Sequence, residues 1–166
     1  GIHDPEIVRR AVELTLDIVE GDDSGLMVEA SLGNVGAGHH FPTYLVPKVY
    51  LQLSLVGPEG KMRPLAERTI GWQVDTAITK ELADTRLPAG EWLEVRQPLA
   101  SPPGEGGVVE ATLKVAPGGH YERAYIDMLK QADKMDAETL RLLRQALTEA
   151  RATRFEAFRL RQPVPG

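Results

Sequence analysis

Aliphatic side chains alternate with polar ones in several stretches of this chain, and this period of two is the feature that most constrains its fold. Successive side chains of a β-strand point to opposite faces of a sheet, so strict alternation predicts a strand with one buried face. The alternating runs are Val12–Ile18, Leu26–Leu32, Val49–Leu55 and Val109–Val115, with Thr69–Val74 and Trp92–Val95 as weaker candidates. Turn-forming clusters separate the runs, one of them over residues 21–25. Short strands punctuated by glycine and proline favour an antiparallel sandwich.

The pattern changes toward the C-terminal end of the chain. Tyr121, Tyr125 and Met128 lie at helical spacing, and Asp136 can cap a second helix that we expect to run to about Phe158. The expected fold is therefore mainly β (α+β): an antiparallel immunoglobulin-like β-sandwich over residues 1–118, followed by a C-terminal helical hairpin over residues 119–160 and a tail over residues 161–166. The helices are expected to pack on the sandwich or on a neighbouring domain. Proline and glycine over residues 97–107 indicate an exposed loop.

Charge and composition exclude several classes of partner. The 166 residues carry a net charge of -5 with no block of Lys or Arg, which argues against duplex nucleic acid or an anionic membrane as a ligand. No apolar run approaches the roughly 20 residues that a membrane span requires. The chain has no cysteine, which rules out disulfides, thiolate zinc sites and covalent attachment of haem to this segment. Its opening at Gly1, with no initiator Met or leader, is read as that of a mature piece or fragment.

No motif of a known catalytic type occurs in the sequence. Neither a Gly-x-Ser-x-Gly elbow nor a His-Glu-x-x-His helix nor a phosphate-binding glycine loop is found. We therefore assign no catalytic residue, and we do not expect this segment to be an enzyme, although a constellation that the fold assembles would escape a reading of the sequence. Trp72 and Trp92 are expected to be core or cross-strand anchors.

The most informative segment is the glycine-rich connection of residues 34–44, which contains two adjacent histidines. An extended backbone would point His39 and His40 to opposite faces, so at most one is expected to face any site. His39 is a candidate nitrogen ligand for haem iron, copper or zinc; alternatively, one histidine bonds a neighbouring carbonyl and stiffens the loop. His3 and His120 are isolated and read as surface residues, but they complete the set of candidate metal ligands: His39, His40, His3 and His120.

The segment Asn34-Val35-Gly36-Ala37-Gly38-His39-His40-Phe41-Pro42-Thr43 resembles a signature, Asn-x-Gly-x-Gly-His-x-x-Pro-Thr-Gly, of bacterial multihaem c-type cytochromes of the cytochrome c554-like kind. The likeness is to their non-haem C-terminal β-sandwich region and spans roughly residues 1–125. The opening residues 1–5 and the turn of residues 84–91 support it. Tyr44 stands where the signature has Gly, which is a departure from the pattern.

The resemblance implies a non-catalytic accessory domain of an exported, periplasmic or extracellular, multihaem cytochrome involved in electron transfer. Haem c would be carried by an upstream domain of the parent chain. His39 would approach a haem of that domain, either as an axial ligand of the iron or as a hydrogen-bond donor to such a ligand. A redox partner protein or a second copy of the chain are further partners to expect. Two alternatives stay open: an independent copper or zinc module built on histidines, and a carbohydrate- or protein-binding sandwich.

Overall fold

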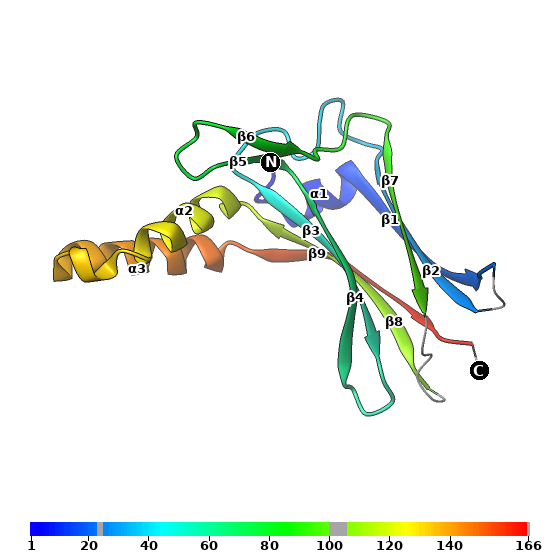
Figure 1. The fold of residues 1–166 in the computed structure, drawn as a ribbon. Helices are drawn as coiled ribbons and strands as arrows, with labels where there is room; N and C mark the ends of the chain where they lie inside the picture. Colours follow the sequence, from blue (N-terminus) through cyan, green and yellow to red (C-terminus); the bar gives the residue numbers. More distant parts are fainter. Residues whose placement is uncertain (23–24, 100–105, 166) are drawn as a thin grey trace.

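The computed structural model describes residues 1–22, 25–99 and 106–165, and it confirms a mainly β fold with helices near the C-terminal end (Figure 1). In chain order, the described elements are α1 (Pro5–Ala11), β1 (Val12–Glu20), β2 (Leu26–Asn34), β3 (Lys48–Val56), β4 (Met62–Ile70), β5 (Trp72–Val74), β6 (Glu81–Asp84), β7 (Trp92–Leu99), β8 (Val108–Ala116), α2 (Gly119–Leu129), a 3-10 turn (Ala132–Lys134), α3 (Ala137–Ala152) and β9 (Phe155–Pro163). Among these residues, no helix has both the length and the apolar character that a membrane span needs.

Two antiparallel sheets form the body of the molecule. One has the strand order β1-β2-β7 and the other β4-β3-β8-β9, while β5 and β6 form a small separate hairpin. The hairpin lies at the same end of the sandwich as α1 and the loops that follow β2 (Figure 1). That end therefore gathers segments from three distant parts of the sequence.

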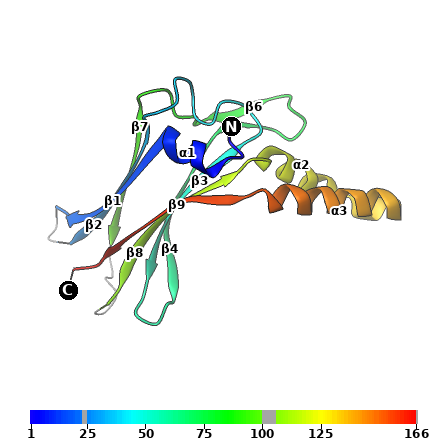
Figure 2. The same cartoon turned by 180° about the vertical axis from the view of Figure 1, so that it is seen from behind.

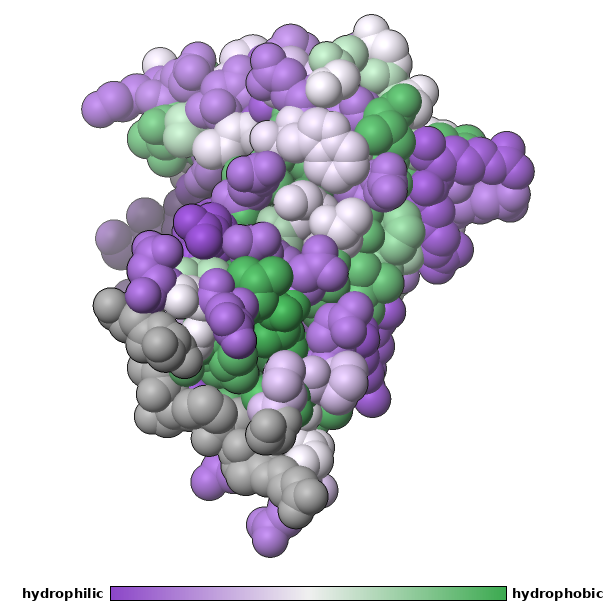
Figure 3. Space-filling view, turned by 90° about the vertical axis from the view of Figure 1, so that its right-hand side faces the viewer, coloured by the Kyte–Doolittle hydropathy of each residue, from purple (hydrophilic) through white to green (hydrophobic). Residues whose placement is uncertain are grey.

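The period-two pattern places its aliphatic side chains in one shared interior. Leu14, Val28 and Leu53, which come from both sheets, are buried in the same hydrophobic cluster. Residues between them, such as Asp17 and Glu94, face outward, and a side view shows largely hydrophilic margins around an apolar strip (Figure 3). The predicted sandwich is thus confirmed at the level of individual side chains.

The C-terminal strand closes one side of the sandwich. Arg9 Nε donates to the Ala157 carbonyl at 2.8 Å, and Gln162 Nε2 donates to the Leu16 carbonyl at 3.2 Å. These bonds join α1 and β1 to β9, which belongs to the opposite sheet. They satisfy backbone carbonyl groups and so link the edges of the two layers on this side.

The end of the second long helix differs from the prediction. The helix was expected to run to about Phe158, but α3 ends at Ala152, and the following residues pair with β8 as β9. Phe155 and Phe158 are three residues apart, a spacing that also suits a helix, whereas Phe155 and the buried Ala157 follow the period of a strand. Residues 155–163, predicted to be helix and tail, therefore complete the four-stranded sheet.

Two weaker predictions also need correction. The candidate strand Thr69–Val74 is divided at Gly71: its first part ends β4, and its second part is β5 of the separate hairpin. A Cβ atom at Gly71 would lie 3.0 Å from Cδ of Lys48, so the chain passes close to β3 at this point. Within the loop predicted over residues 97–107, the first three residues continue β7, and residues 100–105 lie outside the described part of the chain, as do residues 23–24 of the predicted first turn.

Helices α2 and α3 form a two-helix arm, residues 119–152, that projects from the sandwich (Figures 1 and 2). Leu143 and Leu147 of α3 are buried. The Asp136 side chain caps α3 by accepting a hydrogen bond from the Thr139 N–H at 2.7 Å, as the sequence predicted. At the base of the arm, the guanidinium of Arg154 donates to both carboxylate oxygens of the buried Glu122, with Nε at 2.9 and 3.1 Å. This bond raises the pKa of Arg154 above its usual value. The arm is thus tied to the sheet by a charge-assisted hydrogen bond.

We expect Glu122→Ala to lower the free energy of unfolding by about 2 kcal/mol, because the charge-assisted hydrogen bonds from Nε and Nη2 of Arg154 are lost and the half-exposed Arg154 recovers only part of that energy from water. Chemical denaturation with urea measures the effect. Glu138→Ala is the matched control, since its ion pair with Arg141 lies on the exposed surface of the arm. Equal effects of the two substitutions would contradict an anchoring role for Glu122.

Candidate functional site

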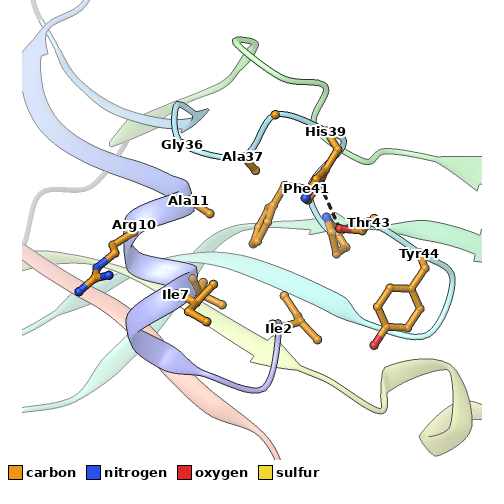
Figure 4. A pocket seen from close by; sticks show the side chains of 14 residues that line it. Ile2, Ile7, Arg10, Ala11, Gly36, Ala37, His39, Phe41, Thr43 and Tyr44 are labelled. Atoms are coloured by element: carbon orange, nitrogen blue, oxygen red, sulfur yellow. Dashed lines mark hydrogen bonds between the residues drawn. The ribbon is translucent and has the colours of Figure 1, made fainter.

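A cavity of about 510 Å³ lies between α1 and the loop that follows β2 (Figure 4). We call it the α1-loop cavity. Ile2, Ile7 and Ala11 line it from the N-terminal side, and Phe41 faces them from the loop. The polar side chains on the loop side include those of His39, Thr43 and Tyr44. A mostly apolar cavity with a few placed polar groups is the usual form of a binding site.

Local sequence signals explain why α1 forms the wall. Asp4 accepts hydrogen bonds from the backbone N–H groups of Glu6, at 2.9 Å, and Ile7, at 3.4 Å, and Pro5 occupies the first helical position. Both features start helices. Arg10 also lines the cavity, but its guanidinium points away from it toward Glu6, with which it forms an ion pair (Figure 4). The groups that face the space are therefore mainly apolar.

The first glycine of the loop, Gly36, is required by a close approach of two backbones. The carbonyl of Ala11, at the end of α1, accepts the N–H groups of Val35 at 3.1 Å and Gly36 at 2.9 Å. A Cβ atom at Gly36 would lie 2.1 Å from the carbonyl oxygen of Arg10, whereas one at Gly38 would meet nothing within 4 Å. Only a residue without a side chain fits at position 36.

Asn34 organises the loop from within. Its side chain is buried, with Nδ2 donating to the carbonyls of His39 at 2.8 Å and Leu87 at 3.0 Å, while Oδ1 accepts from the Ala37 N–H at 3.2 Å. One amide thus satisfies three backbone groups of two loops that are about fifty residues apart in sequence. This gives a physical reason for an asparagine at the start of the glycine-rich segment.

The turn of residues 84–91 packs against the histidine loop and fixes its far side. Phe41 and Leu87 exchange backbone hydrogen bonds at 2.9 and 2.8 Å, and Arg86 Nη1 donates to the Thr43 carbonyl at 3.3 Å. The hydrogen-bonded Arg86 guanidinium lowers the pKa of Asp84, with a smaller contribution from His40. The two segments that carry the family resemblance are therefore neighbours in one structural unit.

His39 lines the cavity with one ring nitrogen engaged. Nδ1 lies 2.9 Å from the His40 carbonyl oxygen and 3.1 Å from Oγ1 of Thr43. A carbonyl oxygen only accepts hydrogen bonds, so the tautomer with its proton on Nδ1 can donate to His40. In that tautomer the lone pair is on Nε2, which is the arrangement found in histidines that bind metals. The two interpretations of the sequence are compatible, because one ring nitrogen can bond the loop while the other is kept for a ligand.

The other candidate histidines do not join His39 in the cavity. His40 is exposed and interacts electrostatically with Asp84, His3 is exposed beside the start of α1, and His120 is buried at the base of the arm. Among the described residues, no three side chains of His, Asp or Glu lie close enough together to hold a metal ion. The predicted metal module, which pairs His39 or His40 with His3 or His120, therefore stays a prediction.

The two tryptophans anchor strands rather than the deep core. Trp92 is 45% exposed and pairs across the strands with Gly33, where a Cβ atom would lie 2.5 Å from its indole ring. Trp72 is half-buried, with the Arg86 guanidinium 4.7 Å from its ring. Of the two predicted roles, Trp92 thus has that of a cross-strand anchor and not that of a core residue.

The wall that α1 contributes was not predicted as part of the site. Nothing in the sequence linked Ile7 or Ala11 to residues 36–44, because the contact is made only when the loop folds back on the end of α1. In the structure Ile7 is 46% exposed, which the sequence alone does not reveal.

Comparisons with known proteins find a similar fold among solved structures. No protein-family model matches the chain, and no curated protein matches it. Among solved structures, the chain is similar to a penta-heme cytochrome c552 from Thermochromatium tepidum, with a TM-score of 0.64 and 16% sequence identity. The alignment covers 99% of this chain but 42% of the cytochrome chain. At this identity the likeness shows a shared fold, and this chain spans less than half of the length of that cytochrome.

Gly36→Ala should lower the free energy of unfolding by about 2–3 kcal/mol, because the added methyl group collides with the Arg10 carbonyl and one of the two backbones must move. Gly38→Ala is the matched control and should change it by about 0.5 kcal/mol or less, because space is open around Gly38. Thermal and chemical denaturation of both variants measure the difference. Similar stabilities would show that the loop does not need its close contact with α1.

Proposed function

We propose that this chain is a non-catalytic accessory domain of an exported multihaem cytochrome, in which the α1-loop cavity faces a haem carried by another part of the same polypeptide. The observation that carries the proposal is the contact of His39 Nδ1 with the His40 carbonyl, which leaves Nε2 as the nitrogen for iron beside an apolar cavity. Electron transfer is then a property of the whole protein, and this domain supplies a scaffold and a haem-facing wall.

The residues present fit a haem that is attached elsewhere. Without cysteine, this chain cannot form the thioether bonds of haem c, whereas an imidazole coordinates iron without them. A bound haem supplies a one-electron redox centre. The apolar side chains of Ile2, Ile7 and Phe41 would keep water from its edge, which lowers the local dielectric constant and so affects the reduction potential.

Thr43 and His40 hold the orientation of the imidazole. The carbonyl of His40 accepts a hydrogen bond from Nδ1 of His39, and Oγ1 of Thr43 lies 3.1 Å from the same nitrogen. Hydrogen bonds of this kind fix the ring and make the opposite nitrogen a better ligand. The loop is in turn held by Asn34, so the orientation of the ring rests on buried contacts.

The structural neighbour supports a multihaem context. Its name describes five haems, and this chain corresponds in fold to less than half of it. A haem-bearing domain elsewhere in the same chain is therefore the first partner that we propose, with a periplasmic or extracellular location. A redox partner protein or a second copy of the chain would be further partners of the complete protein.

A soluble haem c peptide with one open axial position tests the proposal, because it presents haem from outside the chain. When the haem peptide is titrated into the 166-residue protein, the Soret band should shift to that of low-spin, bis-histidine iron, and the shift should saturate. His39→Ala should weaken this binding by about tenfold or more, since the haem-facing ligand is removed.

His40→Ala is the matched control, because His40 is also exposed, does not line the cavity, and contacts the His39 ring only through its backbone carbonyl, which alanine keeps. It should bind the haem peptide as the unmodified protein does. Equal binding by His39→Ala and the unmodified protein would overturn the proposal. Stoichiometric binding of Cu(II) or Zn(II) that is lost in His39→Ala, without haem binding, would instead establish the independent metal module.

A further inference from the structure

The arm is attached to the sandwich through a second, buried contact on the other side of the histidine loop. The backbone N–H of His120, in the first turn of α2, donates to the Val46 carbonyl at 2.9 Å. Gly119 lies against the side chain of Lys48, where a Cβ atom would be 2.6 Å from Lys48 Cγ. We call the four residues Val46, Lys48, Gly119 and His120 the arm joint.

Lys48 is an unusual residue to find inside this joint. It is 1% exposed, and its ammonium group donates to the carbonyls of Leu45 and Pro47. Burial, and to a smaller degree the charge of Arg123, lower the pKa of Lys48 to about 8. At neutral pH the joint therefore already contains one buried positive charge, which backbone carbonyls stabilise.

His120 is buried beside this charge with an unused ring nitrogen. It is 2% exposed, and its Nδ1 atom has no hydrogen-bond partner among the described residues. The charged groups that act on it are Lys48 of β3, Arg123 of α2 and Asp75, which follows β5. Its neighbour Glu122 is already engaged by Arg154.

A proton on this imidazole is costly while the joint is closed. Burial lowers the pKa of His120, Lys48 and Arg123 lower it further, and Asp75 opposes them. In a solvated joint, the same imidazole would return to its ordinary pKa of about 6.5. Since the open state then binds the proton better than the closed state, falling pH favours opening below about pH 6.5.

We infer that the arm joint is an acid-sensitive latch, which holds the α2-α3 arm against the sandwich while His120 is neutral and releases it when His120 and Lys48 are both charged. The Glu122–Arg154 pair is a separate tie that this titration does not break, so the latch frees the arm joint and leaves that ion pair in place. Val46 follows Tyr44 of the α1-loop cavity by two residues, so release would also free one end of that loop.

The absence of cysteine allows a direct measurement of arm position. Spin labels on Lys61→Cys, in the turn between β3 and β4, and Lys134→Cys, at the far end of the arm, report the distance between sandwich and arm by pulsed EPR. We expect one narrow distance distribution at about pH 7.5 and a second population at about pH 5. For each unit by which the pKa of His120 differs between the closed and open arm joint, the ratio of open to closed molecules should change by about tenfold at most.

Three variants identify the group responsible. His120→Gln should remove the second population, whereas His3→Gln, which changes an exposed histidine, should keep it. Lys48→Met keeps the apolar stem but removes the neighbouring charge, so His120 should titrate at higher pH and the change in distance should be smaller. NMR titration of the four imidazoles in the unmodified protein gives the pKa of His120 directly and does not depend on whether the His120 variant folds.

Two results would overturn the latch. One is a distance distribution that stays constant down to about pH 5 in the unmodified protein although NMR shows His120 protonated. The other is an unchanged response to pH in Lys48→Met or His120→Gln.

Discussion

The buried side-chain amide of Asn34 is the interaction on which the rest of the site depends. It stands at the end of β2, where the chain leaves the sheet, and it bonds to backbone groups of both the histidine loop and the turn of residues 84–91. An isolated loop of this length would lose much conformational entropy on adopting one shape. Here three hydrogen bonds inside the protein offset that loss, and they place His39 relative to α1.

The body of the sandwich could be predicted because its signal is local. Each of the four main alternating runs indicates a buried apolar face without reference to any other run, and all four are strands, although Glu110 and Thr112 on the other face of β8 are buried as well. The C-terminal boundary was wrong because Phe155 and Phe158 have the spacing of a helix while Phe155 and Ala157 have that of a strand, and only pairing with β8 decides between them. The division of Thr69–Val74 at Gly71 likewise depends on the neighbouring Lys48, which no local pattern reveals.

For the candidate site, the sequence indicated the loop and its histidine but not its surroundings. His39 was singled out because glycine, histidine and proline gather in one connection, which is a property of neighbouring residues. The apolar wall of α1, the bond between Asn34 and Leu87, and the burial of Lys48 are all contacts between distant segments. Lys48 begins a strand, a position at which a lysine is normally exposed. It is buried here because Gly71 and Gly119, from other parts of the chain, lie against its side chain.

The place at which the arm leaves the four-stranded sheet allows the helices to vary in length without a change in strand pairing. The arm leaves the sheet after β8 and returns as β9, and Val115 and Phe155 are register partners on these adjacent strands. The two ends of the excursion are thus already side by side, as at the ends of an ordinary β-hairpin. A short turn in place of residues 117–154 would leave every strand pairing of the four-stranded sheet available. The helices of the arm can therefore be longer, shorter or absent while the two sheets remain the same.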